Sequence, residues 1–150
     1  MKQINFYAFF IFGSIILSII LTQSCESGTN PADIDYELPE KNLSYYDDLQ
    51  PMFNGKCAFE SGCHGTDNPE LFINFDQKND VMNYRFRVTG EKLVDIVRDL
   101  PNPELSPLYL IVTEGYNSYK EIKRMPLDRN RLPQNNTDGI KQWIKEGAKD

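Results

Sequence analysis

The stretch KCAFESGCHG at residues 56–65 decides how this chain is interpreted. It brings together Cys57, Cys63 and His64, and His64 is the only histidine among the 150 residues. A histidine that directly follows a cysteine is the most informative part of the pattern. The elements on either side of this stretch define the fold that would carry it.

A first helix is predicted immediately before this stretch. Ser44, followed three residues later by Asp47, resembles an N-terminal helix cap. Apolar residues then recur at helical spacing, namely Tyr45, Leu49, Met52 and Phe53. Pro51 lies inside this pattern and should kink the helix or mark its real start, because proline has no backbone donor. The helix is expected to end at or before Cys57.

The last helix has the clearest pattern in the chain. Asn136 or Thr137 is expected to cap its start. One largely apolar stripe then follows at i, i+3, i+4 and i+7, formed by Ile140, Trp143, Ile144 and Gly147. This stripe should face inward and bury the only tryptophan of the chain.

Shorter elements are expected between the two terminal helices. A second helix should stop before Pro101 and Pro103, with one face lined by Leu93, Ile96, Val97 and Leu100. Ser106-Pro107 is a favourable start for a third helix. Segments 65–78 and 115–134 read as loops, the first with a short extended piece. The predicted fold class is therefore mostly α, with packed N- and C-terminal helices.

The N-terminus has the layout of an export signal. Lys2 precedes an uncharged and mostly apolar run over residues 6–21, and the small polar residues 22–24 then lead to Cys25. The sequence LTQSC resembles the lipobox of bacterial lipoproteins, in which the cysteine receives lipid and becomes the new N-terminus. It differs by having Thr22 where an apolar residue is usual. The resemblance implies a signal peptide at 1–24 and lipidation of Cys25. Two alternatives remain open: the apolar run stays uncleaved as a membrane anchor, or Cys25 is a spare thiol beside an ordinary cleavage site.

Composition limits the organisation and the partners of the rest of the chain. Residues 26–41 contain Pro31 and Pro39 and few large apolar side chains, so 25–41 is interpreted as the lipidated cysteine and a flexible tether, with one domain at 42–150. Removal of 1–24 would leave 15 basic and 22 acidic residues, a net charge of −7. Nucleic-acid binding requires a basic patch. No nucleic-acid partner is therefore expected, whereas an acidic surface can steer a basic protein partner.

The order of these features resembles the cytochrome c superfamily over about residues 43–149. The resemblance rests on four matching segments, namely Cys57/Cys63-His64-Gly65, Ser106-Pro107-Leu108-Tyr109, Met125-Pro126, and the terminal helix from Ile140 to Ala148 with Trp143-Ile144. The chain departs from the common C-x-x-C-H motif by having five residues between the cysteines, a C-x5-C-H variant. An outward bulge of residues 58–62 could still place two sulfurs at the fixed positions of the haem vinyl groups.

The resemblance implies one covalent haem c and a carrier of single electrons rather than an enzyme. Cys57 and Cys63 would form the thioethers, His64 would be the proximal iron ligand and Met125 the distal ligand. Met52 is expected in the core, and Met82 lies near a polar turn. The location implied is the bacterial cell envelope, lipid-anchored on the periplasmic or outer-membrane side. Redox partner proteins in the envelope would be the donor and the acceptor.

Other interpretations of the same residues remain open. In an oxidising compartment, Cys57 and Cys63 could form a disulfide in a haem-free envelope lipoprotein that acts as a binding or scaffold module. A zinc site would need four nitrogen or sulfur ligands, and the cluster offers three. A thioredoxin-type pair would show C-x-x-C beside a βαβ pattern, which is absent. A haem enzyme would require that Met125 leave the distal position of the iron open.

Overall fold

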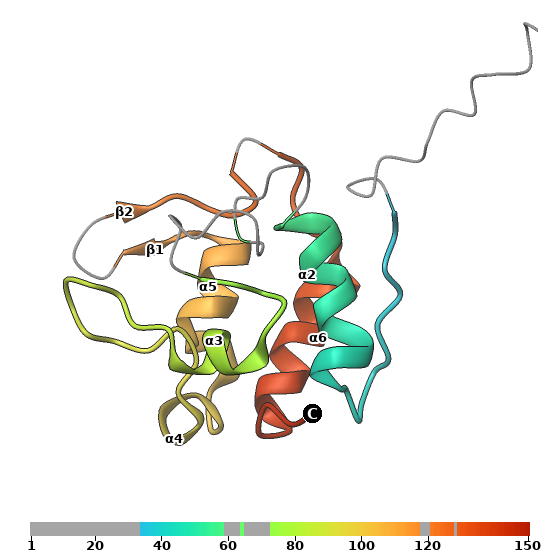
Figure 1. Ribbon diagram of the computed structural model, residues 1–150, viewed down its shortest axis with the longest axis horizontal. Helices are drawn as coiled ribbons and strands as arrows, with labels where there is room; N and C mark the ends of the chain where they lie inside the picture. Colours follow the sequence, from blue (N-terminus) through green and yellow to red (C-terminus); the bar gives the residue numbers. More distant parts are fainter. Residues whose placement is uncertain (1–33, 59–63, 65–72, 118–120, 128) are drawn as a thin grey trace, which may run out of the picture. The chain divides into compact units, whose positions relative to one another are not determined.

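A computed structural model describes residues 34–58, 64, 73–117, 121–127 and 129–150, and these residues form a mostly helical domain (Figure 1). In chain order the elements are η2 Tyr45–Leu49, α2 Gln50–Lys56, α3 Lys78–Asn83, α4 Ile96–Asp99, η4 Pro103–Leu105, α5 Pro107–Thr113, β1 Tyr116–Asn117, β2 Glu121–Ile122 and α6 Gln134–Lys145. In the ranges just given, none of the helices has the length and apolar character needed to cross a membrane. The predicted signal peptide and Cys25 lie outside the described residues.

The predicted first helix is confirmed and has two sections. The Ser44 hydroxyl oxygen accepts a hydrogen bond from the Asp47 backbone N–H at 3.1 Å, as the capping pattern predicts. The chain then makes a wide π-helical turn, η2, before α2 begins at Gln50. Pro51 lies in the first turn of α2, where the missing donor is tolerated. The helix ends at Lys56, directly before Cys57.

The predicted apolar stripe of the last helix is confirmed except for Gly147, which lies beyond the end of α6 at Lys145 and has a φ of +90°. Ile140, Trp143 and Ile144 are completely buried in α6, and the Trp143 ring lies 5.5 Å from the Tyr45 ring of η2, measured between centroids. The helix at the start of the domain therefore packs against the helix at its end. α6 begins at Gln134, after Pro133, so neither predicted cap is correct. The Asn136 side-chain amide donates to the Tyr36 carbonyl, and the Thr137 hydroxyl donates to the Gln134 carbonyl.

The prediction for the second helix was wrong in its extent and its face. Only Ile96–Asp99 is helical, because Asp95 caps a new start by accepting from the Val97 N–H at 3.0 Å. Val97 is 91% exposed instead of buried. Leu93 is buried, but as part of an extended segment whose N–H donates to the Tyr84 carbonyl at 3.1 Å.

Four elements were not predicted, namely α3, the short 3-10 helix η4 and the strands β1 and β2. α3 was missed in a polar stretch, and the 115–134 segment contains the short antiparallel pair β1 and β2, in which Tyr116 lies opposite Ile122. Two-residue strands are too short to give an alternating pattern. Tyr116 is held instead by long-range contacts, since its ring stacks on Phe86 and its hydroxyl donates to Glu91.

Residues 36–43 form a segment that we call the strap. They include part of the predicted tether, yet Tyr36 and Leu38 are half-buried and pack against the core. At one end, the Tyr36 carbonyl accepts from the side-chain amides of residues 135 and 136. At the other end, the N–H groups of Asn42 and Leu43 donate to the Glu146 carboxylate at 2.8 and 2.9 Å. The strap therefore follows α6 from its start to its end, and Figure 1 shows it beside the helical domain.

Candidate functional site

One partly open cavity of about 180 Å³ lies between α5 and the segments that follow the first helix. Its walls are almost entirely apolar, and it is lined by Cys57, His64, Ile73, Phe75, Tyr84, Phe86, Leu93, Leu108, Ile111, Val112 and Met125. An engineered cavity of about 150 Å³ is known to bind benzene. The cavity of this protein can therefore hold aromatic ring atoms, and its open side lets a larger group protrude.

His64 is held in the cavity wall by Phe75. The Phe75 N–H donates to the His64 carbonyl at 3.1 Å, and the two rings meet edge to face with their centroids 5.5 Å apart. Phe75 is in turn fixed by Phe53, whose ring stacks on it at 4.4 Å, and by the Tyr45 hydroxyl, which donates to its carbonyl at 2.8 Å. The first helix therefore positions the imidazole through one aromatic residue.

The imidazole of His64 is chemically available. Burial lowers its pKa below the usual value, which favours the neutral form with a free nitrogen lone pair. Its Nδ1 atom is buried and has no hydrogen-bond partner among the described residues. A buried polar atom without a partner is costly. Such an atom in the wall of a cavity indicates a place for a ligand.

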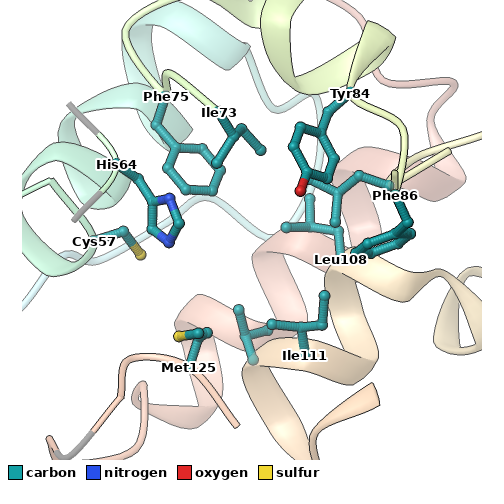
Figure 2. Close-up of a pocket in the computed structure, with 11 residues that line it drawn as sticks. Cys57, His64, Ile73, Phe75, Tyr84, Phe86, Leu108, Ile111 and Met125 are labelled. Atoms are coloured by element: carbon teal, nitrogen blue, oxygen red, sulfur yellow. The ribbon is translucent and has the colours of Figure 1, made fainter. Parts of the chain in front are cut away.

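Met125 enters the same cavity from a different part of the chain. Its N–H donates to the Ile111 carbonyl of α5 at 2.8 Å, so the loop after β2 is fixed against that helix. Figure 2 shows the Met125 side chain across the cavity from His64. The other candidate methionines are not in the wall. Met52 is completely buried in the core, as expected, and Met82 packs against the core from outside.

Cys57 is buried, 8% exposed, and its side chain lies next to His64 at the edge of the cavity (Figure 2). It follows α2 directly, and its N–H donates to the Phe53 carbonyl at 2.6 Å. Cys63 lies outside the described residues. The structure therefore unites three of the four predicted haem residues, while the thioether, disulfide and zinc interpretations, which all need Cys63, stay predictions.

The wall opposite Cys57 contains residues that the sequence did not single out. Tyr84 and Phe86 meet edge to face, with ring centroids 5.6 Å apart and an interplanar angle of 89°. Phe86 also stacks on Tyr116 at 5.5 Å. These residues have no fixed spacing from Cys57 or His64, so the only available signal was the cluster of aromatic residues around position 85.

An ion-pair network supports this wall from behind. Arg98 binds Glu91 at 2.8 Å and the completely buried Asp99 at 2.9 Å. The hydrogen-bonded Asp99 carboxylate raises the pKa of the Arg98 guanidinium. Burial, together with the hydrogen bond to Glu91, raises the pKa of Tyr116 to about 12. The network therefore holds α4, the Glu91 segment and β1 together behind Phe86.

The cavity brings together three side chains with nitrogen or sulfur donors, within an apolar lining. An imidazole nitrogen and a thioether sulfur lie on different sides of one cavity, next to a cysteine sulfur. His64 and Met125 could hold an iron macrocycle such as haem, which would supply one-electron chemistry when bound. The apolar lining would limit water and stabilise a flat hydrophobic group.

Searches with protein-family models, among curated proteins and among solved structures gave no match to this chain.

Proposed function

We propose that this protein is a membrane-anchored monohaem c-type cytochrome that transfers single electrons in the bacterial cell envelope. The observation that carries the proposal is the common cavity of His64, Met125 and Cys57. These three residues come from separate parts of the chain, and the resemblance to cytochromes c assigned each of them a role in haem binding. Their convergence on one apolar cavity supports those assignments.

Each residue has a defined task in this proposal. His64 and Met125 would bind the iron, and Cys57 and Cys63 would attach the ring covalently. When bound, haem supplies a one-electron iron couple whose potential depends on the axial ligands and on burial. Phe75 fixes the direction of the imidazole through its contacts with Phe53 and Tyr45. The apolar walls exclude water from the iron.

The cellular location is part of the same proposal. An export signal at 1–24 would deliver the domain to an envelope compartment, where covalent haem attachment takes place. Lipid on Cys25 would then keep it at the membrane, on the periplasmic or outer-membrane side. Electron donor and acceptor would be redox proteins of the same compartment, and the negative net charge of the chain favours partners with a basic docking surface.

The deciding experiment is co-expression with cytochrome c maturation factors, followed by a denaturing wash and a reduced pyridine haemochrome spectrum. The proposal expects one haem per chain that survives the wash. It also expects Cys57→Ser and Cys63→Ser each to reduce the retained haem. A colourless protein in which Cys57 and Cys63 form a disulfide would refute the proposal and favour the haem-free envelope module.

A second experiment tests the axial ligands. Met125→Ala should remove the six-coordinate ferric spectrum and lower the reduction potential, because a thioether ligand stabilises ferrous iron. Met82→Ala is the matched control, since Met82 packs against the core but does not line the cavity. Equal spectra for wild type and Met125→Ala would exclude Met125 as the ligand. A five-coordinate wild type with peroxidase activity would favour an enzyme.

A further inference from the structure

Three side chains with metal-binding atoms meet at one end of the cavity. Figure 2 shows the Cys57 sulfur beside the His64 ring, with the Met125 sulfur across the cavity from both. The buried Nδ1 atom of His64 has no hydrogen-bond partner within the described ranges. The other described residues in the wall are apolar or aromatic, and none of them is a carboxylate. The chain therefore presents a set of metal ligands even when no haem is attached.

The three donors are fixed by separate parts of the fold. The Cys57 N–H donates to a carbonyl of α2 at 2.6 Å, and the Met125 N–H donates to a carbonyl of α5 at 2.8 Å. The His64 carbonyl accepts from the Phe75 N–H at 3.1 Å, and the two rings meet edge to face. These backbone contacts limit how far each donor can move. A metal ion would therefore bind to a largely preformed site.

The types of donor restrict the metal. Thiolate and thioether sulfur are soft ligands, which favour the soft ion Cu⁺. A blue-copper Cu²⁺ site uses two histidines and a cysteine, whereas His64 is the only histidine of this chain. Zinc sites are built from cysteine, histidine and carboxylate ligands. No group of three such side chains that could hold a metal is found in the described part of the chain, so the third ligand here is the Met125 thioether.

Charge favours the same ion. One Cys57 thiolate neutralises one Cu⁺, while imidazole and thioether ligands are neutral. A divalent ion in the same set would leave one positive charge in an apolar cavity, where an unpaired charge is costly. We infer that the chain without haem binds one Cu⁺ ion in this cavity through Cys57, His64 and Met125. As the Cu–S bond forms, the Cys57 thiol releases its proton to solvent, and the oxidation state of copper does not change.

Copper binding does not depend on haem attachment, but the two states exclude each other. Both use the Cys57 sulfur, which can no longer act as a thiolate once it forms a thioether. Under the proposed function, the copper site would therefore belong to the chain before maturation.

The test uses the full chain made without maturation factors and kept reduced in the absence of oxygen. Replacing Cys25 and Cys63 by serine leaves Cys57 as the only thiol, since the chain has three cysteines. This double-serine protein is titrated into the coloured Cu⁺ complex of bicinchoninate, and loss of the colour measures the transfer of copper. It should withdraw one equivalent of Cu⁺. An equal concentration of Zn²⁺ should not displace the bound copper.

Single substitutions in the double-serine protein test the ligands. Met125→Leu and His64→Gln should each weaken Cu⁺ binding about tenfold or more, because even outer-shell partners change metal affinity by about 10- to 100-fold. Met82→Leu is the matched control and should change nothing, since Met82 packs against the core but does not line the cavity. X-ray absorption at the copper edge should show two sulfur neighbours and one nitrogen neighbour, with one sulfur fewer in Met125→Leu. The fluorescence of the buried Trp143 verifies that each variant is folded.

The outcomes separate this inference from the proposed function. Absence of Cu⁺ binding by the folded double-serine protein overturns the inference. Equal Cu⁺ affinity of this protein and its Met125→Leu variant also overturns it, as does an equal affinity for Zn²⁺. None of these results bears on the proposed function, which depends on covalent haem after maturation. A matured wild type without haem overturns the proposed function and leaves the inference of a copper site standing.

Discussion

Replacement of Gly55 by alanine should destabilise this protein, although the same change stabilises most helices. Gly55 lies in α2, where alanine is favoured over glycine by about 1 kcal/mol. An added Cβ atom would, however, lie 2.7 and 2.8 Å from ring carbons Cζ and Cε2 of Tyr36, and would also meet the hydroxyl. The Tyr36 ring would have to leave its place on the helix.

The size of the effect can be worked out from the contacts that Tyr36 loses. Displacing a half-buried tyrosine exposes about 100 Å², which corresponds to about 2.5 kcal/mol. Loss of the hydrogen bonds to its carbonyl adds about 1 kcal/mol. After subtraction of the helical gain, Gly55→Ala should lower the free energy of unfolding by about 2.5 kcal/mol. In a Tyr36→Ala background the same substitution should raise it by about 1 kcal/mol.

The assay is urea unfolding followed by the fluorescence of Trp143, which is the only tryptophan and is completely buried. The four proteins of the double-mutant cycle are compared with one common denaturant dependence (m-value), and the coupling free energy should be about 3.5 kcal/mol. Leu38→Ala is the control background, because Leu38 covers Gly139 rather than Gly55. An equal cost of Gly55→Ala with and without Tyr36 would refute the reasoning.

Two further predictions concern charged groups. Burial raises the pKa of the Glu146 carboxyl, but hydrogen bonds from Gln142 and from the strap backbone outweigh it and hold the pKa below the usual value. A group with a lowered pKa contributes stability that is present above its unfolded pKa and is lost as the pH falls through its folded pKa. Glu146→Gln should therefore lower the free energy of unfolding by about 1 kcal/mol at pH 7. The difference from wild type should vanish once the wild-type carboxyl is protonated. Urea unfolding from pH 7 to pH 3 tests this, and a difference independent of pH would contradict it. Asp99→Asn should lower the free energy of unfolding by about 2 kcal/mol or more, because it removes a buried charged partner of Arg98. The melting temperature, followed by near-ultraviolet circular dichroism, should therefore fall. An unchanged melting temperature would argue against a stabilising role of the network.

The predictions from sequence were good where local rules dominate. The Ser44 cap and the buried stripe around Trp143 depend on residues a few positions apart, and both are confirmed. The second helix was wrong because its apolar spacing was read without Asp95, which caps a much shorter helix.

The cavity could be predicted only in part. His64 and Met125 were named because the family resemblance carries them, and both line the cavity. Their supports were not predictable, since the Tyr45 hydroxyl meets the Phe75 carbonyl across 30 residues of sequence and no spacing rule connects them. The same is true of Tyr84, which is placed in the wall by its pairing with Leu93.

The strap shortens the part of the predicted tether that is free of contacts with the domain. Ten residues lie between Cys25 and Tyr36, the first described residue that is bound to α6. Fully extended, the chain from Cys25 to Tyr36 spans about 40 Å at most. A lipid on Cys25 would therefore confine the start of α6 to a thin layer above the bilayer. Under the proposed function, the redox centres of its partners would need to lie within that layer. Release of the strap would thicken the layer by the length of seven more residues, about 25 Å.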